Sequence, residues 1–231
     1  MGSEALSTFG PRKTPVQARS TVTVDAISEA TIQVLLSLGA ERLTTTRVAE
    51  RAGVSVGTLY QYYPNKQSLL FALLEKNLNQ VASAVESACE QSRHKPISEM
   101  IKNVVEAFVD AKMSRADISL ALYQIAPDVG GPALAKQAGQ RLRKAIEKML
   151  DTAPDTESPP DKFAIEMMFA SMSGAMRHVL ETGASPAIVR KLREHLVLLC
   201  QSYIAAVTTR RTEGATRRVK GARMGEANAK G

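Results

Sequence analysis

Apolar residues recur along most of this chain at intervals of three and four positions, a spacing typical of helices that bury one face. The first regular segment runs from Thr23 to Leu38, and Gly39 is suited to ending it because glycine adopts positive φ without strain. Asn65 can cap a longer helix, whose apolar stripe consists of Leu69, Leu70, Leu73, Leu74, Val81 and Val85. The pattern predicts two amphipathic helices separated by a shorter segment.

Beyond Pro96 the same periodicity continues, interrupted where prolines and glycines gather. It predicts five further helices, over residues 98–113, 117–125, 133–150, 161–182 and 186–207. Aromatic residues make up 4% of the chain, tryptophan is absent and apolar residues reach 44%. That composition suffices for a core and favours helix packing over sheets. We therefore expect an all-α fold.

The segment from Thr44 to Lys66 has the pattern of two short helices around a tight turn. Small apolar residues, Val48, Ala49 and Ala52, give the first helix a buried face, and Gly53 can end it in the left-handed conformation. Ser55 can cap the second helix, in which Leu59 points to the core. The segment thus predicts a helix-turn-helix at residues 44–63, a structure that DNA-binding proteins place in the major groove.

Gly57-Thr58-Leu59-Tyr60, followed by Tyr62-Tyr63 and Lys66, resembles the DNA-binding segment of the TetR family of bacterial transcription regulators. The likeness extends from about Thr21 to Leu74, and the rest of the chain is similar only in its helical plan. The resemblance implies a three-helix DNA-binding domain, followed by a helical domain that binds a ligand and dimerises through its last two long helices. It also implies release of DNA when a small molecule enters a cavity in the C-terminal helices.

The predicted DNA contacts lie on both helices and at the start of the next one. They are Thr44, Thr45, Ser55, Val56, Gly57, Thr58, Tyr60, Gln61, Tyr62 and Lys66. Gln61 is the leading specificity residue because its amide can bond adenine through two atoms, whereas Lys66 is expected to meet a phosphate. Tyr63 is interpreted as structural, since the family usually has a core Phe there. Arg47 departs from the family, which often has an acidic residue at this position.

The last two predicted helices each carry a seam of apolar residues spaced three and four apart. The seams consist of Ile165, Met168, Met172, Ala175 and Val179, and of Val189, Leu192, Leu196, Leu199 and Tyr203. Joined by the short turn at Gly183, the two helices predict a hairpin that forms a four-helix bundle with a second copy. The alternative is that both seams pack within one chain.

Pliable apolar residues in the C-terminal region are candidates for an effector pocket. They are Val104, Phe108, Tyr123, Met149, Met167, Phe169, Met172 and Met176, joined by Arg177 and His178. Met and Phe at such spacing also occur in ordinary cores, and Arg177 with His178 can instead form a pair across the dimer. Because no His or acidic cluster has metal-ligand spacing, a hydrophobic organic effector is favoured over a metal ion.

The net charge of +7 is concentrated at the ends of the chain. Residues 208–231 contain seven basic residues and two acidic ones, and residues 1–20 combine basic residues with prolines and glycines. We interpret these segments as a disordered basic tail and a flexible basic arm. They flank a DNA-binding domain over residues 21–66 and an effector-binding and dimerisation domain over residues 67–207.

Several classes of protein do not fit the sequence. It has no run of 18 apolar residues and no hydrophobic signal segment, so we expect a cytoplasmic protein without a membrane contact. Cys89 and Cys200 are isolated from other metal-ligand residues, so we expect no bound metal and no cofactor. His94, His178 and His195 lack a catalytic pattern, so we do not expect the protein to be an enzyme. The predicted function is a homodimeric repressor that binds double-stranded DNA at a palindromic operator and responds to a ligand. The alternative is an architectural or adaptor DNA-binding protein without an effector.

Overall fold

A computed structural model describes residues 18–210, and the remainder of the predicted arm and tail, residues 1–17 and 211–231, lies outside the described residues. The helices of this part are α2 (Ala18–Arg42), α3 (Thr45–Ala52), α4 (Val56–Tyr62), α5 (Lys66–Gln91), α6 (Ile97–Met113), α7 (Ala116–Ile125), the 3-10 helix η1 (Ala126–Val129), α8 (Gly131–Leu150), α9 (Lys162–Thr182) and α10 (Pro186–Val207). Two short strands, β1 (Thr156–Ser158) and β2 (Thr209–Arg210), pair antiparallel. The predicted all-α class is confirmed.

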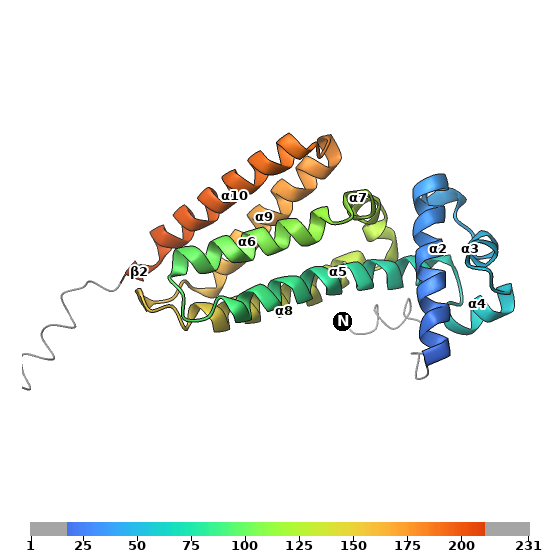
Figure 1. The fold of residues 1–231 in the computed structure, drawn as a ribbon, viewed down its shortest axis with the longest axis horizontal. Coiled ribbons are helices and arrows are strands. Elements are labelled where there is room, and N and C mark those ends of the chain that lie inside the picture. The colour runs from blue at the N-terminus through green and yellow to red at the C-terminus, as the bar shows by residue number, and fades with distance from the viewer. Residues whose placement is uncertain (1–17, 211–231) are drawn as a thin grey trace, which may run out of the picture.

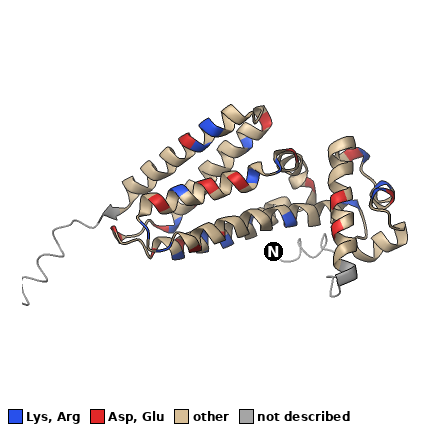
Figure 2. Cartoon of the chain, viewed as in Figure 1, with Lys and Arg blue, Asp and Glu red and all other residues tan. Residues whose placement is uncertain are grey.

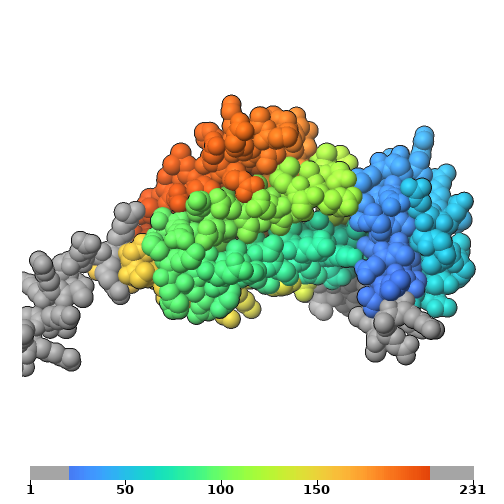
Figure 3. All heavy atoms as spheres, viewed as in Figure 1, coloured from blue at the N-terminus to red at the C-terminus, as the bar shows by residue number. Residues whose placement is uncertain are grey.

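The helices form two groups (Figure 1). Helices α2, α3 and α4, here called the head, lie at one end of an elongated molecule. Helices α5, α6, α8, α9 and α10 form the body, along which α5 runs away from the head. Helix α7 lies between α2 and α9 and contacts both of them. The space-filling view shows the head as a distinct end of the molecule, and it shows α10 along the upper edge of the body (Figure 3).

Helix α2 differs from its prediction at both ends. It begins at Ala18 rather than Thr23, and helical hydrogen bonding continues to Arg42. Gly39 nevertheless interrupts the helix as expected, because its φ of 78° and ψ of 167° are not helical. Among the described residues, Thr21–Arg42 is the one helical segment long and apolar enough to cross a membrane. Its buried residues, such as Ile27 and Val34, pack into the core of the head, so its length and composition are no evidence of a membrane span.

Two clusters of buried side chains hold the structure together. The head cluster joins α2, α3 and α4 to the first turns of α5, and it also takes in Ile118, Leu122 and Ile125 of α7. The body cluster lies between α5, α6, α8, α9 and α10, and Leu120 and Tyr123 of α7 pack against it. Helix α7 therefore contributes one face to each cluster, so a displacement of α7 affects the packing of both.

The predicted dimer seams lie largely inside the single chain. Five of their members are buried in the single chain: Ile165, Met168, Met172 and Leu196 belong to the body core, and Val179 is also buried. For these residues the dimer prediction is corrected, and the alternative of packing within one chain holds. Ala175, Val189, Leu192 and Tyr203 are half-buried, and only Leu199 is exposed. Heptad spacing identifies the apolar face of a helix but not the element that covers it.

Large apolar side chains are exposed on the same two helices, beside the seams or, for Leu199, within one of them. They are Phe163 and Met167 on α9, and Ile188, Leu198, Leu199 and Val207 on α10. Phe163 is 67% exposed and Leu198 is 62% exposed. We call these six residues the α9–α10 face. It is apolar surface that a single chain leaves uncovered.

Candidate nucleic-acid interface and effector cavity

Local hydrogen bonds build the helix-turn-helix as the sequence predicts. Thr44 caps α3 by accepting a hydrogen bond from the Arg47 backbone N–H at 3.3 Å. Gly53 ends α3 in the left-handed region, with φ 68°. Ser55 caps α4 by accepting a hydrogen bond from the Thr58 backbone N–H at 3.0 Å, and the hydroxyl oxygens of these two residues lie 2.8 Å apart. The caps fix where each helix starts, and hence which side chains face outward.

The outward surface of α4 is formed by only part of the predicted set. Ser55, Gly57, Tyr60 and Gln61 are exposed, whereas Thr58 is half-buried. Val56 and Tyr62 are also half-buried because they pack against the head core, so Val56 is less available to a thymine methyl group than the sequence suggested. Leu59 and Tyr63 are buried, which fits their interpretation as structural residues. Burial raises the pKa of the Tyr63 hydroxyl.

The fold of the head does not require a glycine at position 57. A Cβ added there would meet only the Ser55 hydroxyl oxygen, at an ordinary contact distance of 3.7 Å. Gly53 differs because its positive φ favours glycine. The open space beside Gly57 lies on the outer side of α4 and leaves the backbone there accessible to a partner.

Two cations, Arg47 in the head and Lys66 at the start of α5, hydrogen-bond carbonyl groups at the end of α2. The Lys66 ammonium donates to the Ala40 carbonyl oxygen at 3.2 Å, and an Arg47 guanidinium N–H donates to the Arg42 carbonyl oxygen at 2.5 Å. Carbonyl groups at a helix C-terminus lack helical partners and attract positive charge. The contact with Arg42 gives a structural reason for Arg47 at a position where the family often has an acidic residue. Lys66 is half-buried, and its ammonium joins the start of α5 to the end of α2.

Helix α4 carries no charged side chain, as its tan colour in Figure 2 shows. Positive charge on the head comes from α2 and α3, where Arg42, Arg47 and Arg51 lie. Arg51 donates a hydrogen bond to the Gln33 side-chain oxygen at 2.6 Å. Contacts made by α4 itself must therefore use hydroxyl, amide and backbone groups, which are suited to base edges and to phosphate oxygens.

The ten predicted pocket residues do not form one site. Val104, Phe108, Met149, Met172 and Met176 are buried in the body core, where the rings of Phe108 and Phe169 meet edge to face at 5.7 Å. Met167 and His178 are exposed. Tyr123 and Arg177 do line a cavity of about 230 Å³, which we call the α7 cavity. Of the others, Met149 and Phe169 line two different cavities, and Val104, Phe108, Met172 and Met176 fill the space between the helices of the body core.

The α7 cavity also contains residues that the sequence analysis missed. Its walls come from α5, α6, α7, η1, α8 and α9 and include Asn77, Lys112 and Ser119. Lys112 could have been recognised as a buried cation from the sequence, because it follows Phe108 by four positions and so lies on the apolar face of α6. The cavity could not be found from periodicity alone, since its walls come from helices far apart in the sequence.

Lys112 is the most unusual residue of this cavity. Only 6% of it is exposed, and burial lowers the pKa of its ammonium to about 8. The ammonium lies 4.8 Å from the centre of the Tyr123 ring. The Arg177 guanidinium lies 5.8 Å from the same centre and pairs with Glu181 at 2.7 Å. A buried cation and a cation at the surface thus lie near the same aromatic ring.

The remaining candidate groups are dispersed. Among residues 21–208, no three His, Cys, Asp or Glu side chains are arranged to hold a metal ion. Cys89 and Cys200 are buried free thiols, and burial raises their pKa values to about 12 and about 11. Both thiols are therefore protonated near neutral pH.

Two parts of the chain match described protein families. Residues 27–73 match bacterial regulatory proteins of the tetR family, and residues 96–204 match the tetracyclin repressor-like C-terminal domain. The nucleoid occlusion factor SlmA of Haemophilus influenzae is 25% identical over 163 residues, which are 71% of this chain and 64% of SlmA. The match therefore spans just under two thirds of that relative.

A repressor and a solved structure extend the comparison. The HTH-type transcriptional repressor KstR of Rhodococcus jostii is 24% identical over 147 residues, covering 63% of this chain and 66% of KstR. The crystal structure of a TetR-family regulator from Mesorhizobium loti is similar in fold, with a TM-score of 0.69 and 17% identity. That match covers 82% of this chain and 98% of the other.

Proposed function

Because the chain belongs to the TetR family of bacterial regulatory proteins, we propose that it is a homodimeric repressor released from a palindromic operator by a small organic effector. Members of this family are DNA-binding transcription regulators, so that part of the function follows from the family itself. The operator, the dimer and the effector are the proposed elements. The outward surface of α4, with its accessible backbone at Gly57, is the observation that carries the proposal.

For DNA contact, we assign α4 to the major groove and the N-terminus of α3 to the phosphate backbone. Thr44 and Thr45 supply hydroxyl and N–H groups at that N-terminus, which favours a phosphate. Gly57 lets the backbone approach the bases, and Gln61 is exposed and able to bond adenine. Lys66 serves chiefly to fasten the end of α2, as its hydrogen bond to Ala40 indicates.

The α9–α10 face is the proposed dimer interface. Phe163, Leu198 and the four other exposed apolar residues lie on two adjacent antiparallel helices. Packing against a symmetric copy removes this surface from water, and a two-fold axis repeats the same contacts on both subunits. Two heads related by such an axis fit a palindromic operator with one half-site per subunit.

The position of α7 supports control by an effector. Ile118 belongs to the head core, whereas Ser119 and Tyr123 line the α7 cavity. A ligand that binds one position of α7 more tightly than another shifts the balance between two placements of the heads. The cavity therefore offers a route from ligand binding to DNA release.

In vitro selection from random DNA with the purified protein at physiological salt tests the DNA part of the proposal. We expect the retained pool to contain a palindromic motif with two half-sites. A pool without enrichment would contradict sequence-specific repression.

The second candidate is an adaptor that binds DNA without an effector, which the likeness to the nucleoid occlusion factor SlmA favours. In that case the basic tail supplies much of the affinity, and binding falls steeply with salt. Truncation after Arg210 keeps the pairing of β2 with β1. Loss of binding in that variant would support the adaptor, whereas a modest loss equal for all DNA sequences would support the repressor.

A further inference from the structure

We infer that the α7 cavity binds an organic anion whose acidic group contacts the Lys112 ammonium and whose apolar part fills the space between α5, α7 and α8. This inference rests on the proposed effector-controlled function and names the chemical class of the effector. Three features of the cavity carry it: its charge, an unpaired cation and an unpaired amide oxygen.

The charge of the cavity wall is positive. Its lining contains two cations, Lys112 and Arg177, and no Asp or Glu. Most other lining residues are apolar, such as Leu74, Leu78 and Leu122. A wall of this kind suits a ligand with one anionic end and an apolar body.

Lys112 has no acidic partner. Within residues 21–208, no hydrogen bond or ion pair of its ammonium is found, and its contact is the face of the Tyr123 ring. A buried charge without a partner is costly, because it has lost water and gained only a weak cation–π attraction in return. A carboxylate or phosphate beside Lys112 would supply the missing counter-charge.

Asn77 provides a second unsatisfied group. Its side-chain oxygen is buried and has no hydrogen-bond partner, and Asn77 lies in the wall between this cavity and a neighbouring one lined by Asp25 and Glu29. That oxygen accepts hydrogen bonds only. A ligand that also carries a hydroxyl or N–H group would satisfy both Asn77 and Lys112.

Other cavities of the described residues lack this combination. The cavity lined by Glu86 and Arg141 holds acids together with cations, and these two side chains already pair at 2.7 Å. The cavity lined by Arg143 and Glu166 likewise contains an ion pair, at 3.1 Å. In each of these two cavities, at least one acid and one cation already pair with each other on the protein itself.

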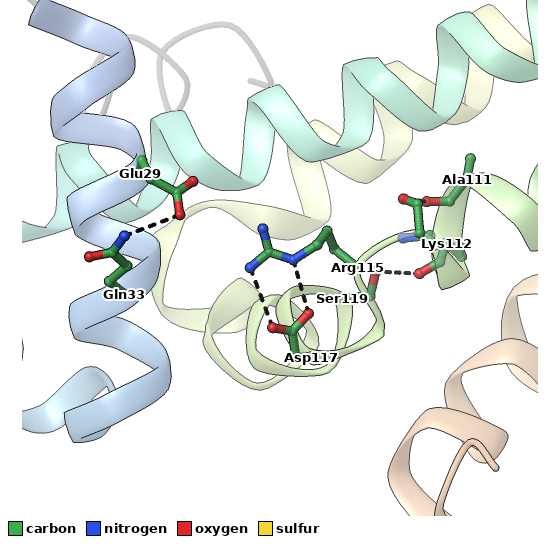
Figure 4. Close-up of polar contacts among 8 residues, drawn as sticks. Glu29, Gln33, Ala111, Lys112, Arg115, Asp117 and Ser119 are labelled. Atoms are coloured by element: carbon green, nitrogen blue, oxygen red, sulfur yellow. Dashed lines mark hydrogen bonds and ion pairs between the residues drawn. The ribbon is translucent and has the colours of Figure 1, made fainter.

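An anion at Lys112 would act directly on α7. The Ser119 hydroxyl donates to the Lys112 backbone carbonyl oxygen at 2.8 Å, and Arg115 pairs with Asp117 across the same turn (Figure 4). Ile118, the residue before Ser119, packs in the head core. A ligand drawn to Lys112 therefore contacts the end of α6 and the start of α7 together.

The affinity of the anion should depend on pH. The charged or titratable groups around Lys112 are Tyr123 from α7 and Arg177 with Glu181 from α9, while α5 contributes the neutral Asn77. In the free protein the pKa of Lys112 is about 8. A bound anion raises that pKa, so affinity should fall as pH rises above about 8, by up to about tenfold per pH unit.

The test uses the full chain and eight-carbon probes that share one apolar body. Octanoate and octyl phosphate are the anions, octanol is the neutral probe and octylamine is the cationic probe. Thermal unfolding and calorimetry at pH 7 should show binding of at least one anion and none of octanol or octylamine. The two anions distinguish a carboxylate site from a phosphate site.

Two substitutions of Lys112 and one control complete the design. Lys112→Met and Lys112→Gln should each lower anion affinity by at least about tenfold, whereas Lys144→Met, at an exposed position of α8, should leave it unchanged. The inference is overturned if no anion binds, if octanol binds as well as the tighter-binding of the two anions, or if Lys112→Met binds anions like the wild type. Because binding is measured without DNA, these outcomes are independent of the operator selection that tests the proposed function.

Discussion

The hydroxyl oxygens of Thr45 and Tyr60 lie 3.1 Å apart, within hydrogen-bond distance. This contact joins the first turn of α3 to the outward surface of α4, although the residues are 15 positions apart. The two helices that we assign to the phosphate backbone and to the major groove are thus linked at the proposed DNA surface. A change at either residue should affect how the two helices are aligned.

Tyr60→Phe tests this link. The variant loses one exposed hydrogen bond, so its unfolding free energy should fall by less than about 1 kcal/mol. Its operator affinity should fall by about threefold to tenfold, because a phosphate contact and the alignment of α3 are both weakened. Fluorescence anisotropy with operator DNA and denaturant unfolding measure the two quantities. Unchanged affinity would remove Tyr60 from the DNA surface.

Gly57→Ala should separate folding from DNA binding. The added Cβ meets only ordinary contact within the head, so stability should be unchanged or higher by up to about 1 kcal/mol. Operator affinity should fall because the methyl group stands where the backbone approaches the bases. Gly139→Ala in α8 is the matched control, since a Cβ there meets nothing within 4 Å. Equal operator affinities for both variants and the wild type would contradict our placement of α4.

Gln61→Ala should relax base preference at one position in each operator half-site. The expected cost at the preferred base is about 1–3 kcal/mol, the usual contribution of a two-atom contact to a base. Selection from random DNA with the variant measures this directly. If affinity falls equally for every sequence, Gln61 contacts the backbone instead.

Substitutions at Leu198 and Met168 should distinguish the α9–α10 face from the predicted seam. Leu198→Glu places a charge on an exposed apolar residue and should shift the protein towards monomers while each chain stays folded. Met168→Ala removes a buried side chain and should lower the unfolding free energy by about 2–5 kcal/mol. Sedimentation velocity and denaturant unfolding report the two effects. A dimer that survives Leu198→Glu would argue against this interface.

Lys112→Met should stabilise the ligand-free protein. The ammonium has a pKa of about 8 in the folded chain against 10.5 ordinarily, so burying the charge costs about 3 kcal/mol of folding free energy wherever both states are protonated. Between pH 8 and 10.5 the unfolded chain holds the proton more tightly, and wild-type stability should rise relative to the variant. The difference in unfolding free energy between Lys112→Met and the wild type should be largest below pH 8 and should shrink as the pH rises towards 10.5. Urea unfolding at pH 7 and pH 10 measures that difference, and equal stabilities at pH 7 would contradict the cost of burying Lys112.

The sequence by itself determined the local structure of the helix-turn-helix. Caps such as Ser55 and the left-handed Gly53 depend on a side chain and its nearest backbone neighbours, so they follow from order along the chain. The all-α class follows in the same way, from apolar spacing and the positions of prolines.

Only the tertiary structure decided which element covers each apolar face. Met168 and Leu198 both fit helical spacing, yet one is buried within the chain and the other is exposed. The Lys66 ammonium donates to the carbonyl end of α2, 26 positions away, a contact that the sequence did not predict. The α7 cavity required six elements to meet. Such contacts depend on how segments remote in sequence pack together. Apolar periodicity shows which residues share a face of a helix, but not which element packs against that face.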